Sequence, residues 1–360
     1  MHIVSRYFGL TESLNPLVIA HKKVKTTDDM MTGGHKIPFI ILVGSLLATW
    51  CGGGGITGSA GVVYSGGPWV GALAYAAPPI GIILLYFIAG RVRKTNKVTV
   101  PEIMGARYGA AASVISALCV MLAYVGVLAT QLKAAADILV LLCHSSGIEI
   151  SHGVALAICT VIIVIITVGG GLVSVAYSDA VSALIMIGGF FLAIPILVHV
   201  ANSQGAVLPP EKASFTGGLS GWTLLGYFLP GLSLMLGDQN MLQRFASAKN
   251  SDEAKKSNIG MFIGELLVII SIIALVTQAA KLYPSLDTPS NVIFQVAVDY
   301  LPLVFGALVM CACMAFIVTT ADSYLLSSAT NLTNDIYVKY INKNATDRQK
   351  MNVLRATIVV

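Results

Sequence analysis

Apolar residues in this chain gather into eight long segments that are separated by shorter polar stretches. A helix that crosses a membrane needs about 20 predominantly apolar residues. The pattern therefore predicts an all-α polytopic membrane protein whose spanning helices lie near residues 38–64, 70–90, 111–143, 153–168, 173–200, 222–237, 259–280 and 301–332.

The first segment contains four consecutive glycines, residues 52–55, near its centre. Glycine in a helix interior costs about 1 kcal/mol relative to alanine. Backbone groups that leave helical pairing inside lipid cost several kcal/mol each unless another partner satisfies them. The glycines predict a discontinuous helix whose freed backbone groups bind an ion or a solute. A kink without any ligand is the alternative.

The sixth segment is short and contains Pro230 and Gly231. Proline removes a backbone donor and clashes with the preceding turn, so we expect this helix to be interrupted there. Broken helices in corresponding positions of two halves indicate a transporter site at an inverted repeat. We therefore expect a core that is built from an inverted repeat. A cytoplasmic leader (residues 1–36) precedes a first repeat of five helices (37–200) and an extracellular loop (201–221). The second repeat (222–360) is incomplete and contains three helices and the start of a fourth.

Composition and charge agree with the membrane assignment. Hydrophobic residues are 56% of the chain and charged residues only 11%, whereas a soluble domain carries about 25% charged residues. If consecutive spans cross the membrane in opposite directions, 19 of the 22 lysines and arginines lie on one side. The exceptions are Lys133, Lys212 and Lys281. Basic residues accumulate in cytoplasmic loops, so we expect a cytoplasmic N-terminus and a plasma or inner membrane location. The net charge of +5 is accounted for by topology and does not indicate nucleic-acid binding.

The eighth segment is unusually polar for a spanning helix, with Thr319, Thr320, Asp322 and Ser323 on consecutive turns. Serine and threonine often bond to their own helix or join two helices. A carboxylate inside a span usually faces a cavity or a partner. Hard cations prefer several oxygen ligands, so the carbonyls of the broken first helix and these hydroxyls could enclose one cation.

The chain is similar to the sodium:solute symporter family, whose fold is the leucine-transporter-type inverted repeat. The resemblance runs from about residue 29 to 360. It rests on four stretches: "DDMMTGGHKIPF", in which His35 replaces the usual arginine, "AYSDAVSALIMIGG", "GDQNMLQRFASAKNSDEA" with Gln243 and Arg244, and "TTADSYLLSSATNLTNDIY". The family usually has one more helix before the first core span, and the apolar run at residues 355–360 stops abruptly. We therefore expect a chain that is truncated at both ends.

The resemblance implies a sodium site and a sodium exit. Its expected metal ligands are the backbone carbonyls of Ala48, Cys51 and Phe316 and the hydroxyls of Thr319 and Thr320. Asp179 is implied as a polar stopping point on the sodium exit path. The alternative for Asp179 is an acid that complements a helix N-terminus.

Alignment to the family also implies a solute pocket formed by Thr49, Trp50, Gly53, Gln131, Gly231, Ser233 and Leu234. The first core helix resembles that of choline transporters within the family, where Trp50 could face a quaternary ammonium group, although it could equally be a packing residue. Lys133 either pairs with Asp137 four residues later, extends outward or meets a solute carboxylate.

These features predict sodium-coupled symport of a small organic solute, such as an amino acid, carboxylate, amine or sugar, by alternating access. Sodium is the expected coupling ion, with no other cofactor; the expected partners are the solute, sodium and the lipid bilayer. The alternatives are proton coupling through Asp322 or Asp179 and a solute-sensing membrane module. An enzyme is not expected, because the chain has no Ser/His/Asp or HExxH constellation.

Overall fold

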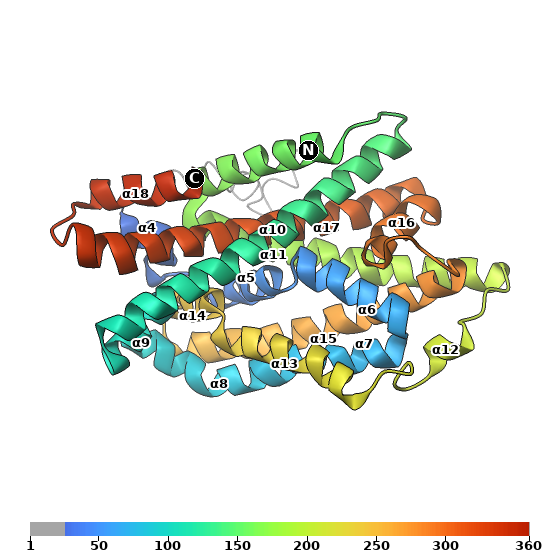
Figure 1. Ribbon diagram of the computed structural model, residues 1–360, viewed down its shortest axis with the longest axis horizontal. Helices are drawn as coiled ribbons and strands as arrows, with labels where there is room; N and C mark the ends of the chain where they lie inside the picture. Colours follow the sequence, from blue (N-terminus) through green and yellow to red (C-terminus); the bar gives the residue numbers. More distant parts are fainter. Residues whose placement is uncertain (1–25, 360) are drawn as a thin grey trace, which may run out of the picture.

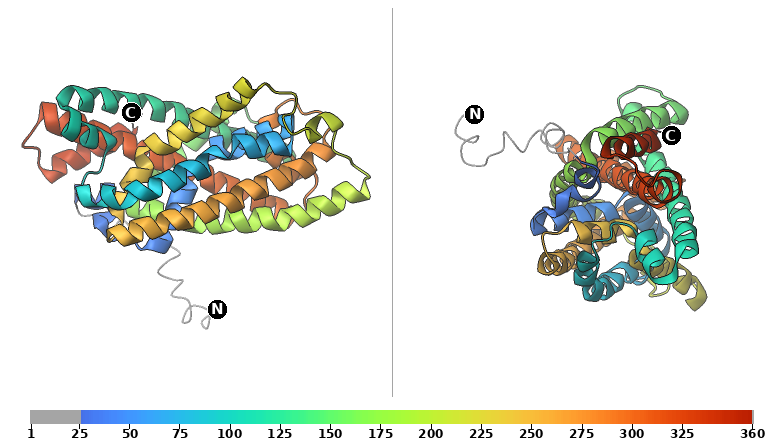
Figure 2. Two further views of the ribbon diagram at one scale, coloured as in Figure 1. Left: turned by 90° about the horizontal axis from the view of Figure 1, so that it is seen from below. Right: turned by 90° about the vertical axis from the view of Figure 1, so that its left-hand side faces the viewer.

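Long apolar helices run along the longest axis of the molecule (Figure 1). The computed structural model describes residues 26–359, so most of the predicted leader, including Arg6, lies outside the described residues. When the molecule is viewed along its long axis, many of the helices appear nearly end-on (Figure 2). The described chain thus forms a bundle of the kind that the hydropathy pattern predicts.

The described helices follow the predicted segments closely. Their bounds in chain order are α4 Thr27–Thr32, η1 Gly33–His35, α5 Phe39–Trp50, η2 Gly54–Gly58, α6 Ser59–Gly66, α7 Pro68–Ala74, α8 Ala77–Thr95, α9 Val100–Tyr108, α10 Ala110–Ser145, α11 His152–Ser203, α12 Pro210–Ala213, α13 Gly221–Gly237, α14 Gln239–Ser247, α15 Ser251–Leu282, η3 Pro289–Asn291, α16 Val292–Asp299, α17 Leu303–Asn331, η4 Leu332–Ile341 and α18 Asp347–Val359.

Six of the described helices are long and apolar enough to cross a membrane, and a seventh span results if the bent pair α5 and α6 is counted as one. The fourth and fifth predicted spans form the single element α11, which turns sharply at Gly171, where φ is 58°. The sixth predicted span is α13, a helix of 17 residues. At 1.5 Å per residue it measures about 25 Å, which is less than the ~30 Å hydrocarbon core. Helix α13 is thus at the short end of the range for a spanning helix, and the count of eight spans stays a prediction.

The first span is broken where its glycines predicted a break. Helix α5 ends at Trp50, the π-helical turn η2 begins at Gly54, and the two halves of the span meet at an angle of 58°. A helix end leaves its last carbonyl groups without intrahelical partners. The break therefore places inside the bundle carbonyl oxygens, such as that of Ala48, that a side chain rather than their own helix can satisfy.

The interruption of the sixth helix is displaced from its predicted position. Helix α13 continues through Pro230, and the chain leaves helical geometry at Asp238, where ψ is 116°. The Asp238 side chain accepts a hydrogen bond from the backbone amide of Asn240 and so caps α14. The expectation of a break at Pro230 was wrong, because a proline can be accommodated within a membrane helix, whereas the Asp238 cap begins a new helix.

The bundle has two ends that the site description uses. The α14 end contains α4, α9, α14 and α18, and the α12 end contains the loop helix α12 together with α16 (Figure 1). Two buried hydrophobic clusters occupy the interior, and Trp50 at the break packs against both of them. The broken first span therefore lies near the middle of the bundle.

Candidate functional site

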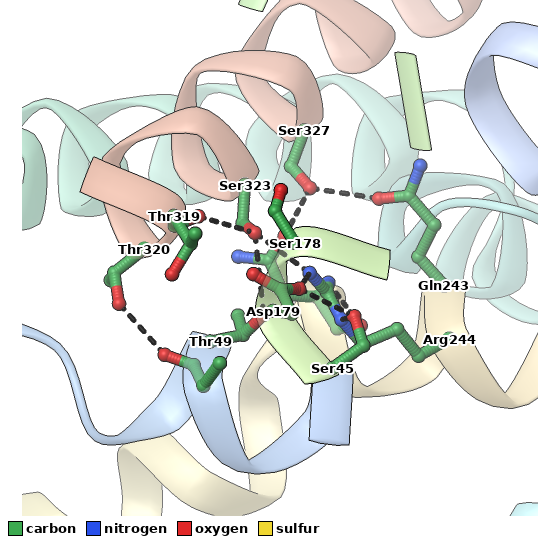
Figure 3. Close-up of polar contacts among 12 residues, drawn as sticks. Ser45, Thr49, Ser178, Asp179, Gln243, Arg244, Thr319, Thr320, Ser323 and Ser327 are labelled. Atoms are coloured by element: carbon green, nitrogen blue, oxygen red, sulfur yellow. Dashed lines mark hydrogen bonds and ion pairs between the residues drawn. The ribbon is translucent and has the colours of Figure 1, made fainter. Parts of the chain in front are cut away.

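The polar segment of α17 packs directly against the break in the first span. The hydroxyl of Thr320 donates a 2.9 Å hydrogen bond to the carbonyl oxygen of Ala48 (Figure 3). The hydroxyl of Thr319 donates to the carbonyl oxygen of Phe316 at 3.2 Å. All five residues expected to hold sodium are buried: Ala48, Cys51, Phe316, Thr319 and Thr320. The two helices that the sequence paired are thus in contact at the expected residues.

Gly52 makes this approach possible. A Cβ atom at Gly52 would lie 2.4 Å from the Thr320 hydroxyl oxygen and 2.6 Å from the Thr320 Cβ. Cβ atoms do not approach other heavy atoms so closely, because the protein interior is close-packed. The absence of a side chain at this position lets α17 touch the backbone at the break.

The donor set suits a hard monovalent cation. It consists of carbonyl and hydroxyl oxygens, the ligand type that such cations prefer. Among the described residues no group of three or more His, Cys, Asp or Glu side chains could hold a metal ion. A neutral oxygen cage favours a singly charged ion over a transition metal, which prefers nitrogen or sulfur ligands.

A buried polar network lies on the α14 side of the break (Figure 3). Arg244 and Asp179 are both at most 1% exposed, and the Arg244 Nη2 lies 3.3 Å from Asp179 Oδ2. Ser45 donates to the same carboxylate oxygen at 2.6 Å and accepts from Arg244 Nε at 2.8 Å. Ser323 accepts from Arg244 at 2.7 Å and donates to the Thr319 carbonyl oxygen. Asp179, the expected sodium exit residue, is thus linked through Arg244 to a predicted sodium ligand.

The Asp238 carboxylate, at the break between α13 and α14, is the centre of a second group of buried hydrogen bonds. Its two carboxylate oxygens accept from Tyr124 at 2.9 Å and from Tyr324 at 2.8 Å, and Asn240 donates its backbone amide to the same side chain. The two tyrosine rings pack edge to face with centroids 4.6 Å apart. Helices α10, α13, α14 and α17 are therefore joined at one carboxylate.

Replacing Tyr324 with phenylalanine should remove one donor from this buried carboxylate. A buried acceptor that loses its partner costs about 1–3 kcal/mol, so we expect a measurable drop in the thermal unfolding temperature of the purified protein. Tyr340→Phe is a matched control, since Tyr340 is exposed. Equal melting temperatures for both variants would contradict a structural role for this hydrogen bond.

An internal cavity of about 250 Å³ extends from the break toward the α12 end. Small-molecule sites commonly measure about 300–1,000 Å³, so this cavity suits a small solute. Four residues that were expected at the solute pocket line it: Trp50, Gln131, Gly231 and Leu234. Gln131 also accepts a 2.5 Å hydrogen bond from the backbone amide of Gly53.

Three other residues expected at the pocket are not among those that line this cavity: Thr49, Gly53 and Ser233. The Thr49 hydroxyl instead lies 3.2 Å from that of Ser323, and Gly53 packs against Ala134 and Gln131. Ser233 is exposed on α13. Residues two apart on a helix point in different directions, so Gly231 and Ser233 cannot both face the cavity.

The structure gives the contacts of two residues whose roles the sequence left open. Asp322 is buried and accepts a 2.5 Å hydrogen bond from Thr167 on α11. Lys133 is exposed and pairs with Asp137 at 2.9 Å. Neither Asp322 nor Lys133 lines the cavity, so Lys133 is not placed to meet a solute carboxylate there.

Sequence reasoning missed Glu265, Tyr75 and Tyr227, which also line the cavity. Glu265 lies within the apolar span α15 and is 3% exposed. An acidic residue inside a span marks a functional site by default, and that signal was present in the stretch "MFIGELLVII". The two tyrosines carried no comparable signal, because tyrosine is common in membrane proteins.

Comparison with known proteins identifies the family. A profile of the sodium:solute symporter family matches residues 30–360. The human high affinity choline transporter 1 is 26% identical over 361 residues, which cover 93% of this chain and 60% of that protein. The sodium/sialic acid symporter NanT of Aliivibrio fischeri is 24% identical, over 94% of this chain and 70% of that protein. The chain thus spans about 60% of the length of the choline transporter.

A solved structure of a Na⁺-coupled sialic acid symporter, in a substrate-bound outward-open state, has a similar fold. Its TM-score is 0.80 at 19% sequence identity, over 97% of this chain and 76% of that one. This likeness confirms the predicted transporter fold. The matched proteins are transporters rather than enzymes. The profile match over nearly all of the described residues establishes that this multi-pass membrane chain belongs to the sodium:solute symporter family.

Proposed function

We propose that the full protein is a sodium-coupled symporter of a small organic solute. The observation that carries the proposal is the contact between the Thr320 hydroxyl and the Ala48 carbonyl at the broken span. In this proposal sodium binds to the carbonyls of Ala48, Cys51 and Phe316 and to the two threonine hydroxyls. The solute binds in the adjacent cavity, beside Trp50 and Gln131.

The distribution of basic residues supports a cytoplasmic position for the α14 end. Arg91, Arg93 and Lys94 lie in the last turns of α8 and Lys97 follows it, and a second group lies in α14 and near the start of α15. Because cytoplasmic loops collect such residues, the cavity at the α12 end faces the outside of the cell. The Arg244–Asp179 network then closes the cytoplasmic side. We propose a plasma or inner membrane location for the protein in this orientation.

The mechanism that this arrangement supports is alternating access between two inverted repeats. Five helices, up to the end of α11, belong to the first repeat, and the helices from α13 onward belong to the second. Sodium binding holds the break and α17 together and so completes the solute cavity. Separation of Arg244 from Asp179 would then open the α14 end. Each bound species lowers the ordering cost of the other, so the coupling is reciprocal.

The sodium gradient supplies enough free energy for this work. One sodium ion that moves down ~100 mV gains about 2.3 kcal/mol, and a tenfold concentration gradient adds ~1.4 kcal/mol. Together they can sustain a solute accumulation of roughly several hundredfold.

Uptake into proteoliposomes that contain the full-length protein tests this function. Radiolabelled proline, choline, acetate, pantothenate and glucose are offered with and without a sodium gradient. The double variant Thr319→Ala/Thr320→Ala should reduce sodium-dependent uptake at least about tenfold, because it removes two of the oxygen ligands that a hard cation needs. Thr330→Ala is the matched control, since this buried threonine of the same helix bonds, within residues 26–359, only to the carbonyl of Leu326.

Two results would contradict the proposal. Uptake that is equally fast without sodium would favour proton coupling, for which the buried carboxyl groups of Asp179 and Asp322 are the candidates. Specific binding of a solute without any uptake would instead favour a sensing module.

A further inference from the structure

Glu265 places a carboxyl group at the wall of the cavity, next to the broken span. The thiol of Cys51 donates to Glu265 Oε2 at 3.0 Å. The neighbouring Gly264 packs so closely on α5 that a Cβ atom there would lie 2.8 Å from a methyl carbon of Leu47. This close approach of α15 to α5 fixes the position of Glu265 beside Cys51.

The carboxyl group has no cationic partner in the described part of the protein. Among the described residues no salt bridge includes Glu265, and the cavity lining contains no lysine, arginine or histidine. An isolated carboxylate in a low-dielectric interior is very costly unless a counter-charge compensates it. The cavity therefore favours an occupant with positive charge and disfavours an anion.

Aromatic rings complete the same wall. Trp50, Tyr75 and Tyr227 line the cavity together with Glu265. The face of an aromatic ring attracts a cation, most strongly when water is excluded. Apolar residues such as Val268 and Ile272 line the cavity as well. These walls suit an organic cation better than a hydrated metal ion, which needs oxygen ligands all around it.

We propose that Glu265 is the counter-charge that selects a solute with an ammonium or other organic cationic group. This inference rests on the proposed function and names the substrate class of the same cavity. The cationic group lies against Glu265 and the aromatic rings, while Gln131, whose side-chain oxygen accepts from the Gly53 amide, lines another part of the cavity.

A pair of probes that differ only in charge tests the selection at equilibrium. Choline and its neutral carbon isostere 3,3-dimethyl-1-butanol compete for the full-length protein in detergent, with sodium present and no gradient. Wild-type protein should bind choline more tightly, and Glu265→Gln should reduce the preference for choline at least about tenfold. The control Glu149→Gln changes an exposed glutamate in the α10–α11 loop and should leave the preference unchanged.

A second measurement does not depend on which solute is natural. Val62 lines the cavity, so Val62→Cys supplies a thiol that reports on the local charge. After division by each reagent's rate with a free small thiol, a cationic methanethiosulfonate reagent should modify this cysteine at least about tenfold faster than an anionic one, and Glu265→Gln should bring the two normalised rates together. The protein without Val62→Cys gives the background rate of the native cysteines.

Equal normalised rates for the two reagents in the Val62→Cys protein that retains Glu265 would overturn the proposal. Tight binding of a neutral or anionic solute, with an affinity that Glu265→Gln does not change, would also overturn it. The same holds if Glu265→Gln changes only the affinity for sodium. Because both measurements are made without a gradient, they can succeed even if sodium-driven uptake fails. A failure of the proposed function is therefore distinguishable from a failure of this inference.

Discussion

Replacing Arg244 with alanine is expected to destabilise the protein by about 3–5 kcal/mol, because it leaves one buried charge without its partner. Asp179 is fully buried, and its second carboxylate oxygen, Oδ1, already has no hydrogen-bond partner. The variant also removes the donors to Ser45 and Ser323. Thermal unfolding of the purified protein, together with the yield of folded protein, measures the effect.

A second substitution separates charge from packing. Asp179→Asn in the Arg244→Ala background removes the orphaned charge and should recover a substantial part of the lost stability. Arg107→Ala is the matched control, since Arg107 is exposed and stacks only over Tyr108; its effect should stay within about 0.5 kcal/mol. An unchanged melting temperature for Arg244→Ala would show that the buried pair does not stabilise the fold.

Gly52→Ala is expected to abolish sodium-dependent uptake, with a loss of about a hundredfold or more, because the new methyl group would push α17 away from the break. Its Cβ would lie 2.4 Å from the Thr320 hydroxyl oxygen. Overpacking of a close contact forces backbone shifts, and displacements of about 1 Å are enough to disable a precisely positioned site. Initial rates of solute uptake over a range of sodium concentrations measure the effect.

Gly58→Ala provides the control for this prediction. Gly58 lies in the same π-helical turn region, and a Cβ atom there would have no heavy atom within 4 Å. Its φ of −62° is accessible to alanine. Normal sodium dependence in Gly52→Ala would show that the contact between Thr320 and the break is dispensable, and the proposed sodium site would then be wrong.

The helices and the break in the first span could be predicted because both depend on local chemistry. Long apolar runs must pair their backbone groups internally in lipid, and four consecutive glycines weaken a helix wherever they occur. The position of the second break shows the limit of such reasoning. Pro230 was the conspicuous breaker, but the aspartate before "QNMLQR" carried the N-cap signal that begins α14.

The site was predictable only where helices present a run of polar residues. The hydroxyls of α17 stand out against an apolar background, so their pairing with the break could be expected. The solute cavity could not be derived in this way, because Trp50 and Gln131 line it while Ser233 does not. The rotation of α13 about its own axis decides which of its faces points inward. This rotation depends on packing against other helices and cannot be derived from the sequence of α13 alone.

The sequence alone determined the membrane-spanning architecture, the broken first span and the polar face of α17, since each follows from the hydropathy or backbone chemistry of one contiguous stretch. Only the tertiary structure decided that Asp179 meets Arg244 and that Glu265 faces the cavity. These contacts join residues far apart in the chain. Their geometry is set by the close packing of helices at small residues such as Gly264, which fixes the rotation and depth of each helix.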